Sequence, residues 1–573
     1  MNSKPLHNAY YACTNRRFPT LLVLVLVASS VVHIWNPIGY PTVHVDEGTY
    51  MRRAMHILEG LGLKEELWEY DHPFFGPLFL AATLSIFGYP GITSPDLANK
   101  DSFSSLYLVP RLIMGLLSVI DTFLVYKIGE IRYGKKVAFL AAALFAVMPL
   151  TWLLRRIYLE SILLPFLLSS ILFAIKTGKS KLGAQMGLSL GSSRECSNIL
   201  QCESFRILIS GVFLGLALFT KTPMIIMIPL VAYLEYKSNR SIAFLGLWLI
   251  PVILIPLIWP MYAILAGDLE EWISGISWQL SRVNNSFLDS LYSIFLIDPA
   301  LAIISALGIA FAAYKRDFLI LLWVLPITLL FGTVLDYVNW FHWMPIQPAL
   351  CIASANFVYN ILFTNKIRQI IRRIIGVFVV AIVIFGVIGT GSLITLDLSA
   401  FQFESFAFTG SFLTNGTKNP IRVSDSTKQY EQDLNGVNMT ARFTVTNSTI
   451  ISSPIYSWVF KYVFDYGGRA HDSYLENKVV DSNQVVLIVD RYFRDYLITE
   501  YQSFQKGNTN ARSNFVQLVQ IDEGARTLAS FEGVTSKYNR FNYPYTSLKY
   551  NFGGSPVEVK VHTDLMLRLL FNQ

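Results

Sequence analysis

Long apolar segments alternate with short polar loops through the first two thirds of the chain. Several of them approach or exceed the roughly 20 residues that a helix needs to cross a bilayer. The apolar segments are 20–36, 73–88, 106–127, 137–152, 157–175, 207–221, 222–236, 241–266, 293–314, 318–335, 343–363 and 374–396. The pattern predicts an α-helical polytopic membrane protein, with about eleven spanning helices in a transmembrane domain over residues 20–396.

Segment 73–88 decides on which side of the membrane each later loop lies. Basic residues collect in cytoplasmic loops, so the basic stretch 1–19 predicts a cytoplasmic N-terminus. If 73–88 crossed the membrane, the later basic loops would all face outward. Its early prolines and modest length favour a juxtamembrane helix within an exterior loop 37–105. The same reasoning requires that 207–236 is split at Lys221–Pro223.

Residues 397–573 differ sharply from the rest, because their apolar runs shorten to the length of strands. With eleven spans before it, this region is predicted to be an exterior soluble α/β domain. Strands are expected at 442–451, 485–490, 514–521 and 557–562, and helices at 456–464 and 491–501. The region has no Gly-rich phosphate loop and no nucleophile elbow. A structural or acceptor-positioning role is therefore favoured over a second catalytic site.

Composition supports a membrane protein, since 53% of the residues are hydrophobic and only 15% are charged. The net charge of +7 is interpreted as basic cytoplasmic loops and not as a nucleic-acid surface. None of the four cysteines lies in 397–573, which fits the exterior of a prokaryotic plasma membrane. A cleaved signal over residues 1–36 is the alternative reading of the first apolar segment.

The stretch VHVDEGTYMRRAMHILEGLG (43–62) places Asp46 and Glu47 directly after the first apolar segment. Apolar residues at helical spacing predict an amphipathic helix over 47–61 that lies at the membrane surface. Asp46 is then either the N-cap of this helix or a catalytic carboxylate, and the spacing leaves both open. Arg52, Arg53 and His56 are interpreted as the polar face of the helix.

Further ionisable residues stand inside or beside apolar segments, where a charge is costly and often functional. These candidates are His72, Arg111, Arg155, Glu160, Lys221 and His342. The alternatives are an ordinary helix entry for His72, an interfacial Arg–Glu pair for Glu160 and an aromatic belt around His342. The membrane loops contain no Asp-x-Asp pair, so no metal site and no cofactor is predicted.

The order of the motifs is more specific than any one of them. The series is VDEGTY (45–50), DHPFFGPLFL (71–80), VPRLIMGLLSVIDTFLVYKIG (109–129), RRIYLESILLPF (155–166), GLALFTKTPMIIMIPL (215–230) and HWMPIQPAL (342–350). Over about residues 15–365 it resembles the GT-C superfamily of membrane glycosyltransferases. The nearest resemblance is to the dolichyl-phosphate-mannose-dependent protein O-mannosyltransferases and the lipid A aminoarabinose transferases.

The resemblance implies roles for particular residues. Asp46 matches the catalytic base, Glu47 its neighbour, and Glu160 a second acidic position where Asp is more usual. His72 matches an HPP segment whose second proline is Phe74 here. Arg111 and Lys221 match basic positions at the second spanning helix and after a Gly-Leu run.

The implied reaction moves a sugar from a polyprenyl (dolichyl) phosphate to a hydroxyl acceptor at the outer membrane face, with inversion. The hydroxyl needs a carboxylate to take its proton, and the leaving phosphate needs cations. Asp46 is the expected base, and Glu160 orients the acceptor or supports the base. The expected phosphate ligands are His72, Arg111, Arg155, Lys221 and His342. An oligosaccharyltransferase and a transporter are the alternatives, and a protein, a lipid or a glycan can be the acceptor.

Overall fold

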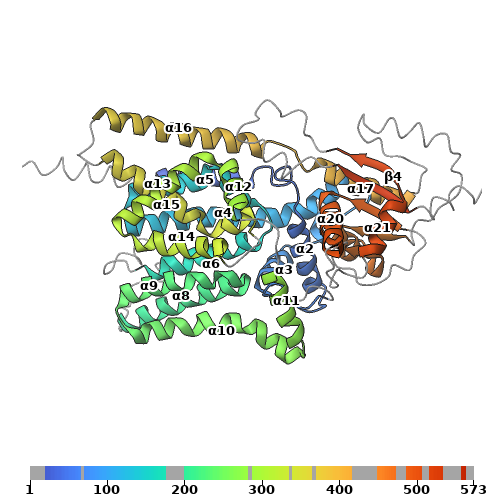
Figure 1. Ribbon diagram of the computed structural model, residues 1–573, viewed down its shortest axis with the longest axis horizontal. Helices are drawn as coiled ribbons and strands as arrows, with labels where there is room; N and C mark the ends of the chain where they lie inside the picture. The colour runs from blue at the N-terminus through green and yellow to red at the C-terminus, as the bar shows by residue number, and fades with distance from the viewer. Residues whose placement is uncertain are drawn as a thin grey trace, which may run out of the picture.

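The computed structural model describes residues 20–65, 70–175, 199–281, 287–333, 338–363, 369–415, 448–472, 485–505, 515–532 and 556–562. A bundle of long helices forms one end of the molecule, and a small sheet with its own helices forms the other (Figure 1). The short helices α2 (Val45–Leu58), α3 (Phe75–Ile86) and α11 (Leu269–Ser281) lie between the two parts.

The bundle begins with the helix Thr20–Ile34. Its other α-helices are α4 (Lys100–Tyr133), α5 (Lys135–Val147), α6 (Leu159–Ala174), α8 (Ile199–Thr220), α9 (Ile228–Asn239), α10 (Ile242–Ala266), α12 (Phe287–Ile297), α13 (Pro299–Lys315), α14 (Phe318–Thr333), α15 (Gln347–Phe363) and α16 (Gln369–Ile394). Short 3-10 helices join them at η1 (Gly91–Thr93), η2 (Pro149–Arg155), η3 (Thr222–Met227) and η4 (Trp340–Ile346).

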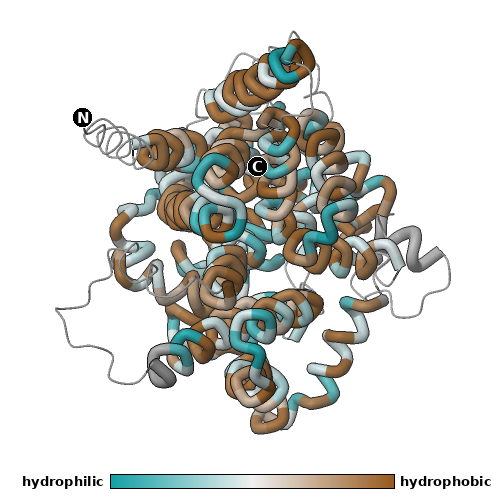
Figure 2. The backbone as a smooth tube through the Cα atoms, turned by 90° about the vertical axis from the view of Figure 1, so that its left-hand side faces the viewer, coloured by the Kyte–Doolittle hydropathy of each residue, from teal (hydrophilic) through white to brown (hydrophobic). Residues whose placement is uncertain are grey.

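Among the described residues, 5 helices are long and apolar enough to cross a membrane, or up to 7 if each of two bent pairs is one span. The predicted eleven spans are therefore not established by length and composition. Large apolar side chains of α10 and α16 face outward, including Leu254 and Leu265 on α10 and Val377 and Ile388 on α16. Figure 2 shows the apolar colouring of the bundle helices, as expected for surfaces that contact lipid.

The predicted break in 207–236 and the predicted short helix in 73–88 are both present. Helix α8 ends at Thr220 and α9 begins at Ile228, so the segment 207–236 is split around Lys221–Pro223 as expected. Helix α3 has 12 residues, which is about 18 Å of helix and too short to cross a hydrocarbon core of about 30 Å. This agrees with a juxtamembrane position for 73–88.

The segment 293–314, which was counted as one span, is not one helix. Helices α12 and α13 meet at an angle of 116°. Asp298 separates them and caps α13, since its Oδ1 accepts the Leu301 N–H at 2.9 Å. Pro299 at the first helical position has no N–H to continue α12. A buried cap thus overrides an apolar pattern that the sequence alone reads as continuous.

The C-terminal region forms a sheet of five strands in the order β2-β1-β3-β5-β4 among the described residues. The strands are β1 (Thr449–Ser452), β2 (Ala470–Asp472), β3 (Val485–Val489), β4 (Ala525–Phe531) and β5 (Val557–His562). Strands β2, β1 and β3 are parallel to one another, and β5 pairs antiparallel with both β3 and β4. The helices are α17 (Ala400–Asn415), α19 (Pro454–Trp458), α20 (Arg491–Gln505) and α21 (Phe515–Gly524), with the short turns η8 (Val459–Val463) and η9 (Gly467–Arg469).

Most of the elements expected in this region are confirmed. Strands β1, β3 and β5 and helices α19 and α20 lie where the sequence predicts them, although 442–447 is outside the described residues. The strand predicted at 514–521 is wrong, because it forms α21. Leu518 and Ile521, three residues apart, both pack into the core beside the sheet, which requires a helix. Strand β4 was not predicted.

Helix α2 is not the surface helix that its pattern indicated. Its backbone at Gly48 packs so closely on α19 that an added Cβ would lie 2.3 Å from the Pro454 carbonyl oxygen. Arg52 is buried and binds Glu65 (2.5 Å) and Asp472 of β2. The His56 ring lies 3.2 Å from the Tyr462 hydroxyl oxygen. Arg52 and His56, interpreted from the sequence as part of a polar face, instead join α2 to the C-terminal region.

Candidate active site

Asp46 stands in the first turn of α2 and does not cap it. The N-cap is His44, whose Nδ1 accepts the Asp46 N–H at 3.2 Å, while Glu47 Oε1 accepts the His44 N–H at 3.0 Å. The capping interpretation of Asp46 is therefore wrong. The Asp46 side chain is 32% exposed, and its Oδ2 lies 3.8 Å from His44 Nδ1. The carboxylate remains accessible to a substrate.

Glu47 and Arg111 form a fully buried pair beneath Asp46. Arg111 Nε and Nη2 donate to the two Glu47 oxygens at 2.8 and 2.7 Å. The other Arg111 bonds go to the carbonyl oxygens of Pro37, Pro41 and Thr42. The pair therefore fixes the beginning of α2 against α4. A guanidinium that makes all these bonds holds Glu47, and it is not free to bind a phosphate in this conformation.

Glu160 and Lys221 form a second buried ion pair between the start of α6 and the end of α8. The Lys221 ammonium also lies 5.6 Å from the centre of the Phe341 ring. From the sequence, an interfacial Arg–Glu pair was the non-catalytic alternative for Glu160. The structure gives it Lys221, a residue 61 positions away in the chain, so the two expected site residues come together.

Two consecutive arginines end the 3-10 helix η2, and both are buried. Arg155 donates to the Trp35 carbonyl, and its Nε and Nη1 have no hydrogen-bond partner among the described residues. Arg156, which was not among the candidates, donates to the Tyr158 hydroxyl at 2.9 Å. Its Nε lies 4.0 Å from Glu47 Oε1. The doublet Arg155–Arg156 was the only sequence signal for this second cation.

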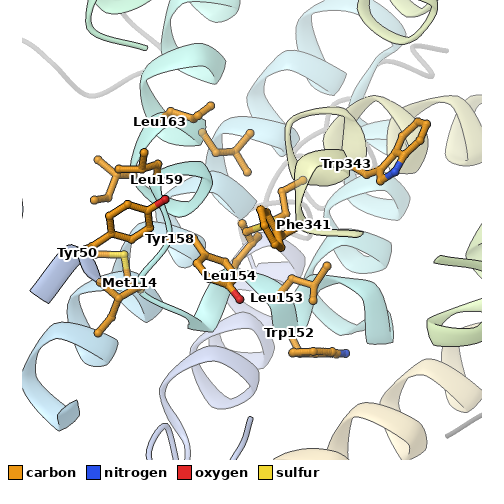
Figure 3. Close-up of a cluster of buried hydrophobic side chains, with 14 of the residues drawn as sticks. Tyr50, Met114, Trp152, Leu153, Leu154, Tyr158, Leu159, Leu163, Phe341 and Trp343 are labelled. Carbon is orange, nitrogen blue, oxygen red and sulfur yellow. The ribbon is translucent and has the colours of Figure 1, made fainter. Parts of the chain in front are cut away.

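The acidic residues of three segments converge on Tyr50. Burial raises the pKa of the Tyr50 hydroxyl well above its usual value, and Asp46, Glu160 and Asp71 add to the shift. Figure 3 shows Tyr50 in one buried cluster with Tyr158, Leu159 and Phe341. The predicted base Asp46 and the second acid Glu160 are therefore both close enough to Tyr50 to raise its pKa.

His72 precedes α3, and His342 lies in η4. Asp71, beside His72, forms an ion pair with Arg53 at 2.7 Å. Burial alone would raise the pKa of Asp71, but Arg53 and His72 keep it below its usual value. His342 Nδ1 accepts the Asn339 N–H at 3.1 Å and so caps η4. The geometry gives His342 a structural contact, with its ring 4.5 Å from that of Phe341.

The C-terminal region reaches the candidate site through the end of β3. Asp490 Oδ2 accepts the Ser453 hydroxyl at 2.5 Å, and its Oδ1 accepts the Phe493 N–H at 2.8 Å. These bonds join the ends of β1 and β3 and orient the first turn of α20. Tyr492 in that turn lies 5.0 Å from His44, measured between ring centres. Tyr492 is a site residue that the sequence analysis missed.

Burial raises the pKa of Asp490 from 3.8 to about 6. The folded chain therefore keeps this proton at pH values where the unfolded chain has lost it. The free energy of unfolding should fall as the pH rises from about 4 to about 6, by about 3 kcal/mol from this group.

Among the described residues, no group of three or more His, Cys, Asp or Glu side chains could hold a metal ion. The acidic loop residues Asp268 and Glu271 each pair with Lys64 at 3.0 Å. They tie α11 to the segment that follows α2.

No protein-family model and no curated protein sequence matches the chain. Solved structures do. The oligosaccharyltransferase AglB from Archaeoglobus fulgidus, in complex with an inhibitory peptide and a dolichol-phosphate, is 13% identical with a TM-score of 0.49 and covers 85% of this chain and 71% of that one. ArnT from Cupriavidus metallidurans bound to undecaprenyl phosphate is 12% identical with a TM-score of 0.48, covering 83% and 94%.

The Pmt1-Pmt2 protein O-mannosyltransferase complex of S. cerevisiae bound to the sugar donor is 16% identical, with a TM-score of 0.30 over 45% of this chain and 34% of that one. The chain spans 63% of the apo oligosaccharyltransferase structure from Archaeoglobus fulgidus, less than two thirds of its length. These neighbours are GT-C glycosyltransferases, the superfamily that the ordered motifs resemble. At such low identity the similarity is one of fold alone.

Proposed function

We propose that the protein is a membrane glycosyltransferase that moves a sugar from a polyprenyl phosphate to a hydroxyl acceptor at the exterior face. The observation that carries this proposal is the position of Asp46. Its carboxylate is partly exposed and lies in the helix turn that the buried Glu47–Arg111 pair fixes, and like Glu160 it raises the pKa of Tyr50. A base on a rigid support, with a cation nearby, is what this transfer needs.

In the proposed step, Asp46 takes the proton of the acceptor hydroxyl as its oxygen attacks the anomeric carbon. The bond from that carbon to the phosphate oxygen breaks, and its electron pair leaves on the phosphate. Attack from the face opposite the phosphate inverts the anomeric centre. The growing negative charge is stabilised by Lys221 and by Arg155, whose buried Nε and Nη1 carry no hydrogen bond to the described residues.

The contacts divide the other candidates into two groups. Arg111 and Glu47 act as the support of α2, and their role is to hold Asp46 in place. Glu160 positions Lys221, and His72 and His342 are proposed to border the phosphate. The membrane placement proposed for this reaction has residues 1–19 in the cytoplasm and 397–573 outside the plasma membrane, so that the lipid tail of the donor stays in the bilayer.

The test is Asp46→Asn in the full chain, purified in detergent and supplied with a polyprenyl-phospho-sugar and hydroxyl acceptors. Loss of the base should lower the transfer rate about 10²–10⁴-fold. The matched control is Asp101→Asn, which changes an exposed Asp in the first turn of α4. A transfer rate in Asp46→Asn equal to that of the control would refute the assignment.

Two further assays, one with a peptide acceptor and one with the protein reconstituted in vesicles, separate the alternative functions. Transfer of a lipid-linked oligosaccharide to an Asn-containing peptide would indicate an oligosaccharyltransferase. Uptake of sugar lipid into vesicles without consumption of the donor would indicate a transporter.

A further inference from the structure

His44 lies inside a cluster of aromatic side chains that meets Asp46. Its ring centre is 5.0 Å from that of Tyr492, 5.6 Å from Tyr158, 6.2 Å from Phe341 and 6.3 Å from Trp340, all in edge-to-face arrangements. These residues come from the turn before α2, the turn before α6, η4 and the start of α20. Four distant segments of the chain thus build one aromatic cluster, which we call the His44 cluster.

The polar atoms of His44 have fixed roles. Nδ1 accepts the Asp46 N–H, so it carries no proton, and in the neutral ring Nε2 is the N–H donor. Burial and the nearby Arg156 and Arg491 hold the pKa of His44 well below its usual value. The ring is therefore neutral at physiological pH. It offers one directional donor next to the proposed base.

The His44 cluster is close to both of the groups that the reaction needs. At one side Asp46 Oδ2 is 3.8 Å from the His44 ring, and at the other the Lys221 ammonium is 5.6 Å from the centre of Phe341. In an in-line displacement, the sugar must lie between the base that serves the acceptor and the cation that serves the phosphate. The aromatic cluster is the surface that the chain provides at this place.

Only part of the cluster is accessible. Tyr158 and Phe341 are buried, while His44, Trp340 and Tyr492 are partly exposed. Flat aromatic side chains with a few polar atoms are typical of sites that bind a small polar ligand with an apolar face. A pyranose ring has such a face in its C–H groups and carries hydroxyls around its rim.

We propose that the ring of the transferred sugar docks on the accessible edge of His44, Trp340 and Tyr492, and that His44 Nε2–H donates to one of its hydroxyls. This inference rests on the proposed function and assigns the sugar subsite within it. It also makes Tyr492, from the exterior domain, a substrate-contacting residue.

The test compares the binding of two lipids to the full-length protein in detergent. One is a polyprenyl phosphate, and the other is the same lipid carrying mannose, glucose or aminoarabinose, whichever the protein binds most tightly. The wild-type protein should prefer the sugar-bearing lipid by about tenfold or more. His44→Asn and Tyr492→Leu should each lose most of this preference, with affinity for the sugar-free lipid within about twofold of wild type.

Asn is chosen at position 44 because its side-chain oxygen keeps the helix cap. His56→Asn is the matched control, since it makes the same change on the same helix away from the cluster, and it should keep the preference. Tyr492→Leu carries the test if His44→Asn does not fold.

The outcomes distinguish the two proposals. A preference that survives in both cluster variants overturns the sugar subsite while leaving the transferase intact. A wild-type protein that transfers sugar but binds both lipids equally also overturns the subsite. A wild-type protein that binds neither lipid and transfers nothing overturns the proposed function and the subsite with it.

Discussion

A substitution of the buried Arg111 tests whether this arginine supports α2 or binds the substrate phosphate. The substitution Arg111→Lys keeps the positive charge and removes the planar fork. In the structure the guanidinium makes two bonds to Glu47, two through Nη1 to the carbonyls of Pro37 and Pro41, and one to the Thr42 carbonyl. A lysine has three donors and cannot match this geometry.

The magnitude follows from the number of bonds that lysine cannot make. At least two bonds of a charged donor are lost, each worth about 1.5–3 kcal/mol, so the free energy of unfolding should fall by about 3–6 kcal/mol. This agrees with about 3–5 kcal/mol for disrupting a buried ion pair. For a chain of this size the expected decrease in Tm is on the order of 5 °C. Arg111 holds Glu47, which lies in the first turn of α2 beside Asp46. The kcat should therefore fall together with the stability.

The assay is thermal unfolding in detergent together with steady-state transfer. The control is Arg132→Lys, which lies on the same helix and pairs with Asp317 at 3.3 Å from a side chain that is 39% exposed. It should change stability by less than about 1 kcal/mol. An Arg111→Lys protein that is as stable as wild type and shows only a higher KM for the lipid donor would refute the support role and restore a phosphate contact.

Three further variants test other contacts of the site. Lys221→Met leaves Glu160 buried without its partner, and should lower the free energy of unfolding by about 3–5 kcal/mol and weaken donor binding in a lipid titration. Gly48→Ala puts a Cβ 2.3 Å from the Pro454 carbonyl oxygen and should cost about 1–3 kcal/mol in thermal unfolding; an unchanged Tm would mean that α2 does not pack on α19. Asp490→Asn should be as stable as wild type near pH 4 and more stable at pH 7, because it removes the proton loss between pH 4 and about 6; parallel Tm-against-pH curves would contradict this.

Periodicity and turn chemistry were sufficient to predict most of the architecture. Lys221–Pro223 breaks a long apolar run, and the break is visible in the sequence because proline cannot continue a helix. Strand β3 was identifiable from VVLIV, whose residues are all buried. The bend at Asp298 was not predictable in this way. One acidic residue in an apolar segment looks like a local exception in the sequence. In the fold, its carboxylate caps α13 through the Leu301 N–H and also accepts the Leu150 N–H of η2 at 3.3 Å, a contact that the sequence does not show.

The candidate residues could be selected from the sequence, but their pairings could not. The ordered motifs selected Asp46, Glu47, Arg111, Glu160 and Lys221, and the structure brings all of them to one region. The sequence could not show that Arg111 faces Glu47 or that Lys221 faces Glu160, since partners 64 and 61 positions apart depend on how helices pack.

Tyr492 was missed because the two regions of the chain are not independent. The sequence treats 397–573 as a separate cap because its composition changes there. In the fold, Gln402 makes two hydrogen bonds with the Val43 backbone just before α2. The Tyr107 hydroxyl of α4 donates to the Ile455 carbonyl at 2.8 Å.

Helix α2 is therefore held both by the bundle and by the C-terminal region. Arg111 of α4 fixes its first turn, and Asp472 of β2 binds Arg52. A carboxylate that must meet an acceptor hydroxyl within hydrogen-bond distance needs this kind of fixed backbone, because a misplacement of about 1 Å can cost two orders of magnitude in rate. The C-terminal region therefore helps to hold the helix that carries Asp46, and its contacts with Arg52 and His56 explain why the polar face of α2 is buried and not solvated.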